Sequence, residues 1–117
     1  MSHPDIVYKI CAREDWEQAR ENGRFEGAQI DVTDGFIHFS SAAQVRETAR
    51  RHYAGKRDLL LIAIDATQLG DDLKWEPSRG GDLFPHLHAA LPVDTVLWEA
   101  PLPIGEDGVH QFPETLI

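Results

Sequence analysis

A histidine and a serine stand two positions apart in a short apolar segment, where they could bind one ligand together. The segment GFIHFS spans residues 35–40 and contains His38 and Ser40. Side chains alternate along a strand, so the histidine and the serine would project on one face, opposite Ile37 and Phe39. An imidazole can donate a hydrogen bond to a ribose hydroxyl, with the serine hydroxyl beside it. The alternative is a hydrogen-bonded structural histidine next to a strand-end serine.

The Arg79-Gly80-Gly81 sequence is the second candidate for ligand contact. Adjacent glycines let the backbone approach a ligand closely and expose amide donors. The planar guanidinium of arginine fits phosphate or carboxylate, and it would supply fixed positive charge in an acidic protein. A turn after Pro77 explains the same residues without any ligand. Both interpretations stay open on the sequence.

His86 and His88 form an H-x-H pair. On a strand both imidazoles would point the same way, and with His38 they could form a three-histidine metal site. A metal-dependent hydrolase is therefore one alternative function. No cysteine or carboxylate stands at a recognised ligand spacing, and Pro85 favours an irregular segment. We therefore expect no metal cofactor.

A capped helix should follow the GFIHFS segment directly. Ser41 and Gln44 have the spacing of a capping box. The apolar residues after them recur at helical spacing, at Val45, Ala49 and Tyr53. A strand that ends where a helix starts would hold the histidine and the serine in fixed positions.

The remaining elements indicate a small α+β domain. Residues 59–64 are apolar at every position, which predicts a central strand covered on both faces. A first helix should end at Asn22-Gly23. In the last strand, Val96 and Trp98 would share the face opposite Glu99. Two helices and roughly six strands predict an α+β fold with small mixed or antiparallel sheets. Further strands are expected at residues 7–11, 73–76 and 95–100, and a loop at residues 26–34.

The composition predicts one soluble domain, with 42% hydrophobic and 26% charged residues. The formal net charge of -9 argues against non-specific nucleic-acid binding. The longest apolar run, residues 59–64, is too short to span a bilayer, and residues 1–5 show no secretory signal. A single cysteine suits a reducing compartment. We therefore expect a cytoplasmic protein without membrane contact, and the sequence indicates no particular protein partner.

Two segments resemble a bacterial family of unknown function: GFIHFS at residues 35–40 and WEPSRGGDLFPHL at residues 75–87. The resemblance covers nearly the whole chain, and the second segment is long enough to be specific. Members of that family are small and cytoplasmic. Their fold looks like the catalytic domain of ADP-ribosyltransferases, with small split and curved sheets around a NAD cleft. The resemblance therefore implies a single ADP-ribosyltransferase-like α+β domain over residues 1–117.

The resemblance also implies roles for particular residues. In that superfamily, a histidine or arginine followed two residues later by a hydroxyl residue holds the nicotinamide riboside, and His38 and Ser40 are similar to that pair. The superfamily also stacks an aromatic residue on nicotinamide and uses a late-strand glutamate to stabilise the ribosyl cation. Tyr53 and Glu99 are the residues here that would take those parts. The motif around Arg79 belongs to the family and not to the transferase pattern.

Our leading hypothesis is an ADP-ribosyltransferase-like cleft that binds NAD or a related nucleotide and, if it is catalytic, transfers ADP-ribose. His38 and Glu99 would be the catalytic residues, with the carboxylate stabilising an oxocarbenium-like state. A non-catalytic ligand-binding module is the first alternative, and the metal-dependent hydrolase is the second. NAD would be the cofactor, bound by His38, Ser40, Tyr53, Arg79, Gly80, Gly81 and His86.

Overall fold

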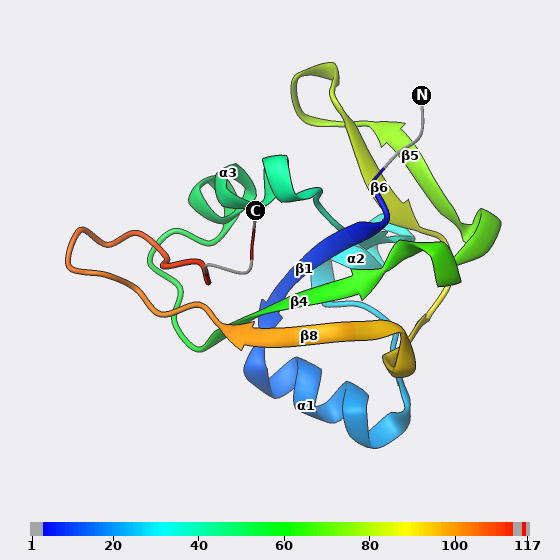
Figure 1. The fold of residues 1–117 in the computed structure, drawn as a ribbon, viewed down its shortest axis with the longest axis horizontal. Helices are drawn as coiled ribbons and strands as arrows, with labels where there is room; N and C mark the ends of the chain where they lie inside the picture. The colour runs from blue at the N-terminus through cyan, green and yellow to red at the C-terminus, as the bar shows by residue number, and fades with distance from the viewer. Residues whose placement is uncertain (1–3, 114–115, 117) are drawn as a thin grey trace.

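The described part of the chain folds into three small antiparallel sheets with three α-helices packed around them (Figure 1). This computed structural model describes residues 4–113 and 116, apart from the side chains of Gln29 and Arg79. The predicted α+β class is confirmed. None of the helices among the described residues combines the length and apolarity needed to cross a bilayer.

The largest sheet has the order β1-β4-β8, with β1 at Ile6–Ala12, β4 at Leu59–Asp65 and β8 at Val96–Pro101. Strand β4 is central, as its unbroken apolar run predicts, because hydrophobic clusters cover both of its faces. Leu60 and Ile62 belong to one cluster, while the alternate residues of the strand belong to the other. Strand β1 is an edge strand, which leaves one of its sides open to other elements.

The second sheet has the order β3-β6-β5, with β3 at Ile37–His38, β6 at Leu83–Leu87 and β5 at Leu73–Pro77. The expectation of an irregular segment around Pro85 is wrong, because Pro85 lies in the middle strand of this sheet. Proline costs a strand one amide donor. The Pro85 carbonyl still accepts a hydrogen bond from the Phe39 N–H at 3.0 Å, so the residue after β3 remains bonded to β6.

A third, two-stranded sheet and four short 3-10 helices complete the described fold. Strands β2 at Arg24–Phe25 and β7 at Leu91–Pro92 pair with each other. Short 3-10 helices occupy Ala66–Gln68, Gly70–Asp72, Arg79–Gly81 and Val93–Thr95.

Two of the three α-helices follow the sequence prediction. Helix α1 spans Arg13–Asn22 and ends at Gly23, whose φ of 84° is the left-handed conformation that glycine adopts easily. Helix α3 spans Ala42–His52, and the Gln44 side chain accepts a hydrogen bond from the Ser41 N–H at 3.0 Å. The capping-box prediction is therefore supported by this contact.

Helix α2 at Gln29–Asp34 lies where we expected only a loop. Its two large apolar side chains, Ile30 and Val32, are 58% and 64% exposed, so no apolar stripe marks the helix in the sequence. A buried carboxylate holds it instead, because Asp31 accepts a hydrogen bond from the Ala28 N–H at 2.8 Å. Polar anchoring of this kind leaves no hydrophobic periodicity to detect.

A register shift alters the faces of β8. The pairing with β4 shifts between Ala63 and Ile64, which is a β-bulge or a similar irregularity. Val96 therefore packs against one hydrophobic cluster and Trp98 against the other. The prediction that these two residues share a face is wrong, because an extra residue in a strand reverses the alternation.

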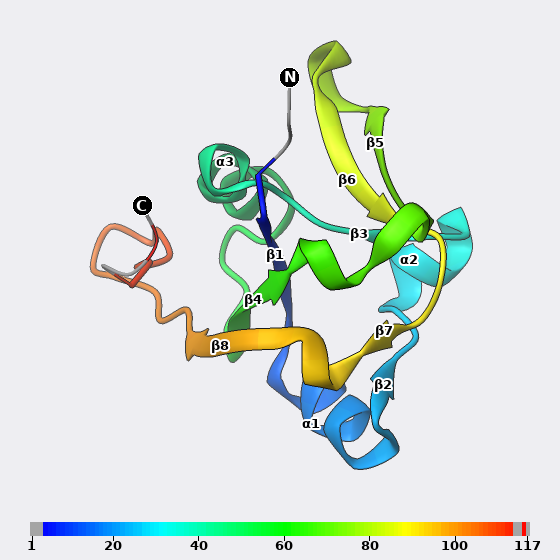
Figure 2. The same ribbon diagram turned by 45° about the vertical axis from the view of Figure 1, so that its right-hand side comes forward.

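Strand β1 has helix α3 on one side and helix α2 on the other (Figure 2). An isolated antiparallel bridge between Tyr8 and Ser40 joins the backbone edge of β1 to the chain that follows β3. Their N–H and C=O groups exchange hydrogen bonds of 2.8 and 2.9 Å. Beyond this pair, residues 9–12 of β1 line a cavity.

Candidate functional site

A cavity of about 620 Å³ runs along the edge of β1 between α2 and α3. Its volume lies within the range of ordinary small-molecule sites. The residues His38, Ser40, Tyr53 and His86, all predicted to contact the cofactor, line this cavity. Strand pairing explains how the two histidines meet, since His38 and His86 are opposite each other across β3 and β6. Their ring centroids lie 5.5 Å apart.

The Arg79-Gly80-Gly81 sequence forms the end of the hairpin between β5 and β6. The Gly81 N–H donates to the Ser78 carbonyl at 3.0 Å, and Gly80 and Gly81 have φ of 67° and 86°. Both glycines thus serve a turn that side-chain-bearing residues rarely adopt. Ser78 lines the cavity, whereas the two glycines do not. The side chain of Arg79 lies outside the described residues.

Glu99 is not brought to this cavity. It lies on β8, the edge strand opposite to β1, and its carboxylate faces helix α1. Trp16 Nε1 donates to Glu99 Oε2 at 2.7 Å, and Arg20 donates to Glu99 Oε1 at 3.0 Å. The strand order separates Glu99 from His38, and a sequence pattern that locates a strand cannot reveal that order. Its position gives no support to the predicted catalytic role.

A buried carboxylate that the sequence analysis missed orients His38. Asp31 Oδ1 lies 2.6 Å from His38 Nδ1 and accepts the His38 backbone N–H at 3.0 Å. Lys9 Nζ donates to Asp31 Oδ2 at 2.9 Å and also to the His38 carbonyl at 3.0 Å. Lys9 and Asp31 are only 2% and 1% exposed. The lysine and the aspartate therefore fix both the backbone and the ring of His38.

Opposing effects act on the pKa of Asp31. Burial alone would raise it, but the hydrogen bond from His38 and the charge of Lys9 outweigh burial and hold the pKa well below its usual range. On the far side of the His38 ring, Nε2 lies 3.0 Å from Asp34 Oδ2. A neutral imidazole can donate to only one of these two carboxylates, whereas an imidazolium donates to both.

Three histidines surround the ring of Phe36. The ring stacks on His86 with centroids 4.2 Å apart, and the rings of His38 and His88 lie 4.7 and 5.2 Å from it. Glu76 Oε1 lies 2.9 Å from His86 Nδ1 and 2.8 Å from His88 Nε2. Burial lowers the pKa of His86, and its bond to Glu76 offsets part of that effect.

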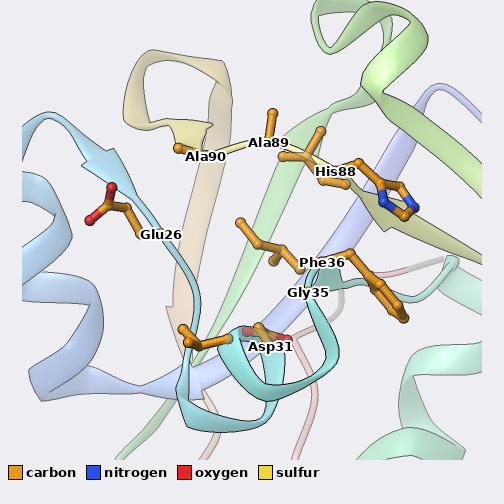
Figure 3. A pocket seen from close by; sticks show the side chains of 10 residues that line it. Glu26, Asp31, Gly35, Phe36, His88, Ala89 and Ala90 are labelled. Atoms are coloured by element: carbon orange, nitrogen blue, oxygen red, sulfur yellow. The ribbon is translucent and has the colours of Figure 1, made fainter.

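A second, smaller pocket of about 300 Å³ is lined by Phe36 and His88, among others. Figure 3 shows Phe36 and His88 on one side of this pocket and Glu26 on the other. Asp31 lines this smaller pocket, whereas its partner Lys9 lines the larger cavity. The smaller pocket shares Asp31 and Phe36 with the surroundings of His38.

The metal alternative has little support in this geometry. Within the described residues, no group of three or more His, Cys, Asp and Glu side chains could hold a metal ion. The ring of Phe36 contacts His38, His86 and His88. We expect elemental analysis of the purified protein to find no zinc or iron near one atom per chain. A stoichiometric metal that stabilises the fold against chelators would contradict this expectation.

The fold and site together define a small α+β protein with three antiparallel sheets and a cavity beside the edge of β1. A sequence family described as "Protein of unknown function (DUF952)" matches residues 10–99. The chain belongs to this family. No curated protein matches it.

Solved structures of a bacterial relative have the same fold. The crystal structure of protein CC0527 from Caulobacter crescentus is 48% identical and superposes with a TM-score of 0.90, covering 95% of this chain and 97% of that one. The solution NMR structure of CC0527 is 48% identical with a TM-score of 0.83, covering 92% and 93%. The arrangement of the sheets therefore has an experimentally determined counterpart.

Proposed function

We propose that the chain binds NAD, ADP-ribose or a related nucleotide in the cavity between α2 and α3. The observation that carries this proposal is the meeting of His38, Ser40, Tyr53 and His86 in one cavity. These residues come from three segments of the chain. The resemblance to ADP-ribosyltransferases implied a nucleotide contact for His38, Ser40 and Tyr53, and the leading hypothesis added His86. The cavity volume of about 620 Å³ suits a ligand of that size.

The side chains around the cavity offer distinct contacts. Thr48 Oγ1 donates to the Gln44 carbonyl at 3.1 Å, so Ser40 Oγ is the donor in its 2.9 Å bond to Thr48 Oγ1. The lone pairs of Ser40 Oγ could then accept from a ligand hydroxyl. Tyr53 already donates its hydroxyl to the Ile10 carbonyl at 3.1 Å. Burial raises the pKa of Tyr53 to about 12, so the phenol stays neutral. The ring of Tyr53, which lines the cavity and also packs against the hydrophobic cluster that contains Leu61, is then the part that a ligand would contact.

Binding is the primary part of the proposal, and transfer of ADP-ribose is secondary. The glutamate expected to stabilise the ribosyl cation is paired with Trp16 and Arg20 next to α1. A shared fold does not fix a shared reaction. A non-catalytic nucleotide-binding module fits the same cavity without that carboxylate.

We expect ADP-ribose, NAD or ADP at millimolar concentration to raise the melting temperature of the protein. Binding at about 100 times the Kd stabilises the folded state by about 2.7 kcal/mol. His38→Ala should remove most of this shift. His88→Ala is the matched control, because His88 does not line the cavity. The proposal would be overturned if none of the three ligands gave binding heat in titration calorimetry and none raised the melting temperature.

A second measurement separates a binding module from an enzyme. Release of nicotinamide from NAD, followed by chromatography, reports cleavage of the glycosidic bond. We expect Glu99→Gln to leave ligand affinity unchanged, because Glu99 contacts α1 and not the cavity. If the wild type releases nicotinamide and Glu99→Gln does not, Glu99 takes part in the reaction. That result would support the transferase mechanism.

A further inference from the structure

The charged side chains that line the cavity are unevenly distributed. Asp34 at the end of α2 supplies negative charge beside His38. Asp15 in the first turn of α1 lies at the other end of the cavity, near the chain after α3, because the Arg13 N–H donates to the Asp58 carbonyl at 2.9 Å. His52 in the last turn of α3 and Lys56 just beyond that helix supply the basic groups. Figure 2 shows α2 and α3 on opposite sides of β1. The α2 side of the cavity, with Asp34, is therefore its acidic side, and the α3 side, with His52 and Lys56, is its basic side.

Lys56 is a basic group at the cavity that the helix dipole does not explain. Lys9 also lines the cavity, but it is buried and paired with Asp31. None of the ion pairs found within residues 4–113 includes Lys56 or His52. Cations in the last turn of α3 complement the helix dipole, which accounts for His52 in part. Lys56 lies four residues beyond the helix end, so the dipole does not account for it.

An anionic group is disfavoured on the acidic side. Asp34 Oδ2 lies 3.0 Å from His38 Nε2, and Asp31 occupies the other ring nitrogen. A phosphate placed against His38 would meet the Asp34 carboxylate, and like charges in contact repel strongly. The whole chain carries a net charge of -9, so an anion needs a local cation to enter the cavity.

Neutral hydroxyl groups suit the acidic side. A carboxylate accepts hydrogen bonds through both oxygens, which matches the two hydroxyls of a vicinal diol. Asp34 is partly exposed at the cavity, with 42% of its side chain accessible, and His38 and Ser40 stand near it as further polar groups. The acidic side of the cavity thus favours neutral hydroxyl groups, and the basic side favours an anionic group of the same ligand.

We infer that the cavity takes a phosphorylated riboside, with the ribose diol at Asp34 and His38 and the phosphate at Lys56 and His52. This inference rests on the proposed nucleotide binding and adds the direction in which the ligand lies. It also assigns the phosphate to the α3 side rather than to Arg79. Binding of a neutral nucleoside should then be independent of Lys56, whereas binding of its phosphorylated relatives should not.

Titration calorimetry with adenosine, ADP and ADP-ribose tests the inference. We expect Lys56→Gln to lower the affinity for ADP and ADP-ribose by about tenfold or more and to leave the affinity for adenosine unchanged. Arg57→Gln is the matched control, because Arg57 is exposed and does not line the cavity. Asp34→Asn should weaken all three ligands alike, since it removes a charged acceptor for the diol. Higher salt should weaken ADP-ribose binding in the wild type more than in Lys56→Gln.

The possible results separate the two proposals. If the wild type binds ADP-ribose and Lys56→Gln binds it equally well, the inference is overturned while nucleotide binding stands. The same holds if Arg79→Gln carries the loss, or if Lys56→Gln weakens adenosine as much as ADP-ribose. If the wild type binds none of the three ligands, the inference and the proposed function both fail. An unchanged melting temperature of the unliganded variants shows that the fold is intact.

Discussion

Replacing Lys9 by methionine should lower the free energy of unfolding by about 3–5 kcal/mol, which is the usual cost of removing one partner of a buried ion pair. The variant keeps most of the aliphatic volume of Lys9 but leaves Asp31, only 1% exposed, without its charge partner. It also removes the donor to the His38 carbonyl. Urea unfolding measures the change. Lys74→Met is the matched control, because Lys74 is exposed on β5 and should change stability by about 0.5 kcal/mol or less.

The same pair makes stability depend on pH in a defined direction. The pKa of Asp31 is lower in the folded protein than in the unfolded chain, because bonds from His38 and Lys9 outweigh the effect of burial. Its contribution is therefore complete above the ordinary aspartate pKa of about 4 and is lost as the pH falls below that value. We expect this acid loss to be smaller in Lys9→Met. A Lys9→Met variant as stable as the Lys74→Met control would show that water or other groups solvate Asp31.

The contacts among Lys9, Asp31 and His38 show which features of the site the sequence could not predict. The alternation in GFIHFS placed His38 and Ser40 on one side of the strand, because alternation depends only on local geometry. The meeting of His38 with His86 depends on the pairing of β3 with β6, which no local pattern encodes. Asp31 was missed for a related reason. It acts through contacts to Lys9, 22 residues away, and it sits in a helix without an apolar stripe.

The position of Glu99 also depends on long-range strand pairing, which the sequence pattern does not encode. Its strand was predicted, with β8 at Val96–Pro101 overlapping the expected residues 95–100. Its distance from the cavity is set by the order β1-β4-β8, in which β8 lies at the edge opposite to β1. Sheet order is decided by long-range pairing, so the sequence could identify a late-strand glutamate but not its neighbours. Trp16 and Arg20 are those neighbours.

The central strand was predictable because both of its faces exclude water, and its loss should be costly. Leu61 is fully buried in β4, in the cluster that contains Val45 and Ala49 of α3. We expect Leu61→Ala to lower the free energy of unfolding by about 2–5 kcal/mol, from lost burial and from the cavity left behind. Leu97→Ala is the matched control, since Leu97 on β8 is 50% exposed and should cost about 1 kcal/mol or less.

The position of Leu61 also predicts which part of the protein loosens. Its cluster joins α3 to the sheet, and α3 carries Thr48 and His52 at the cavity. Hydrogen exchange should therefore speed up in α3 of Leu61→Ala more than in α1, which packs in the other cluster through Trp16. Ligand affinity should fall with it, because the basic side of the cavity is then less well ordered. A loss of less than about 1 kcal/mol, with equal exchange in both helices, would show that β4 does not anchor α3.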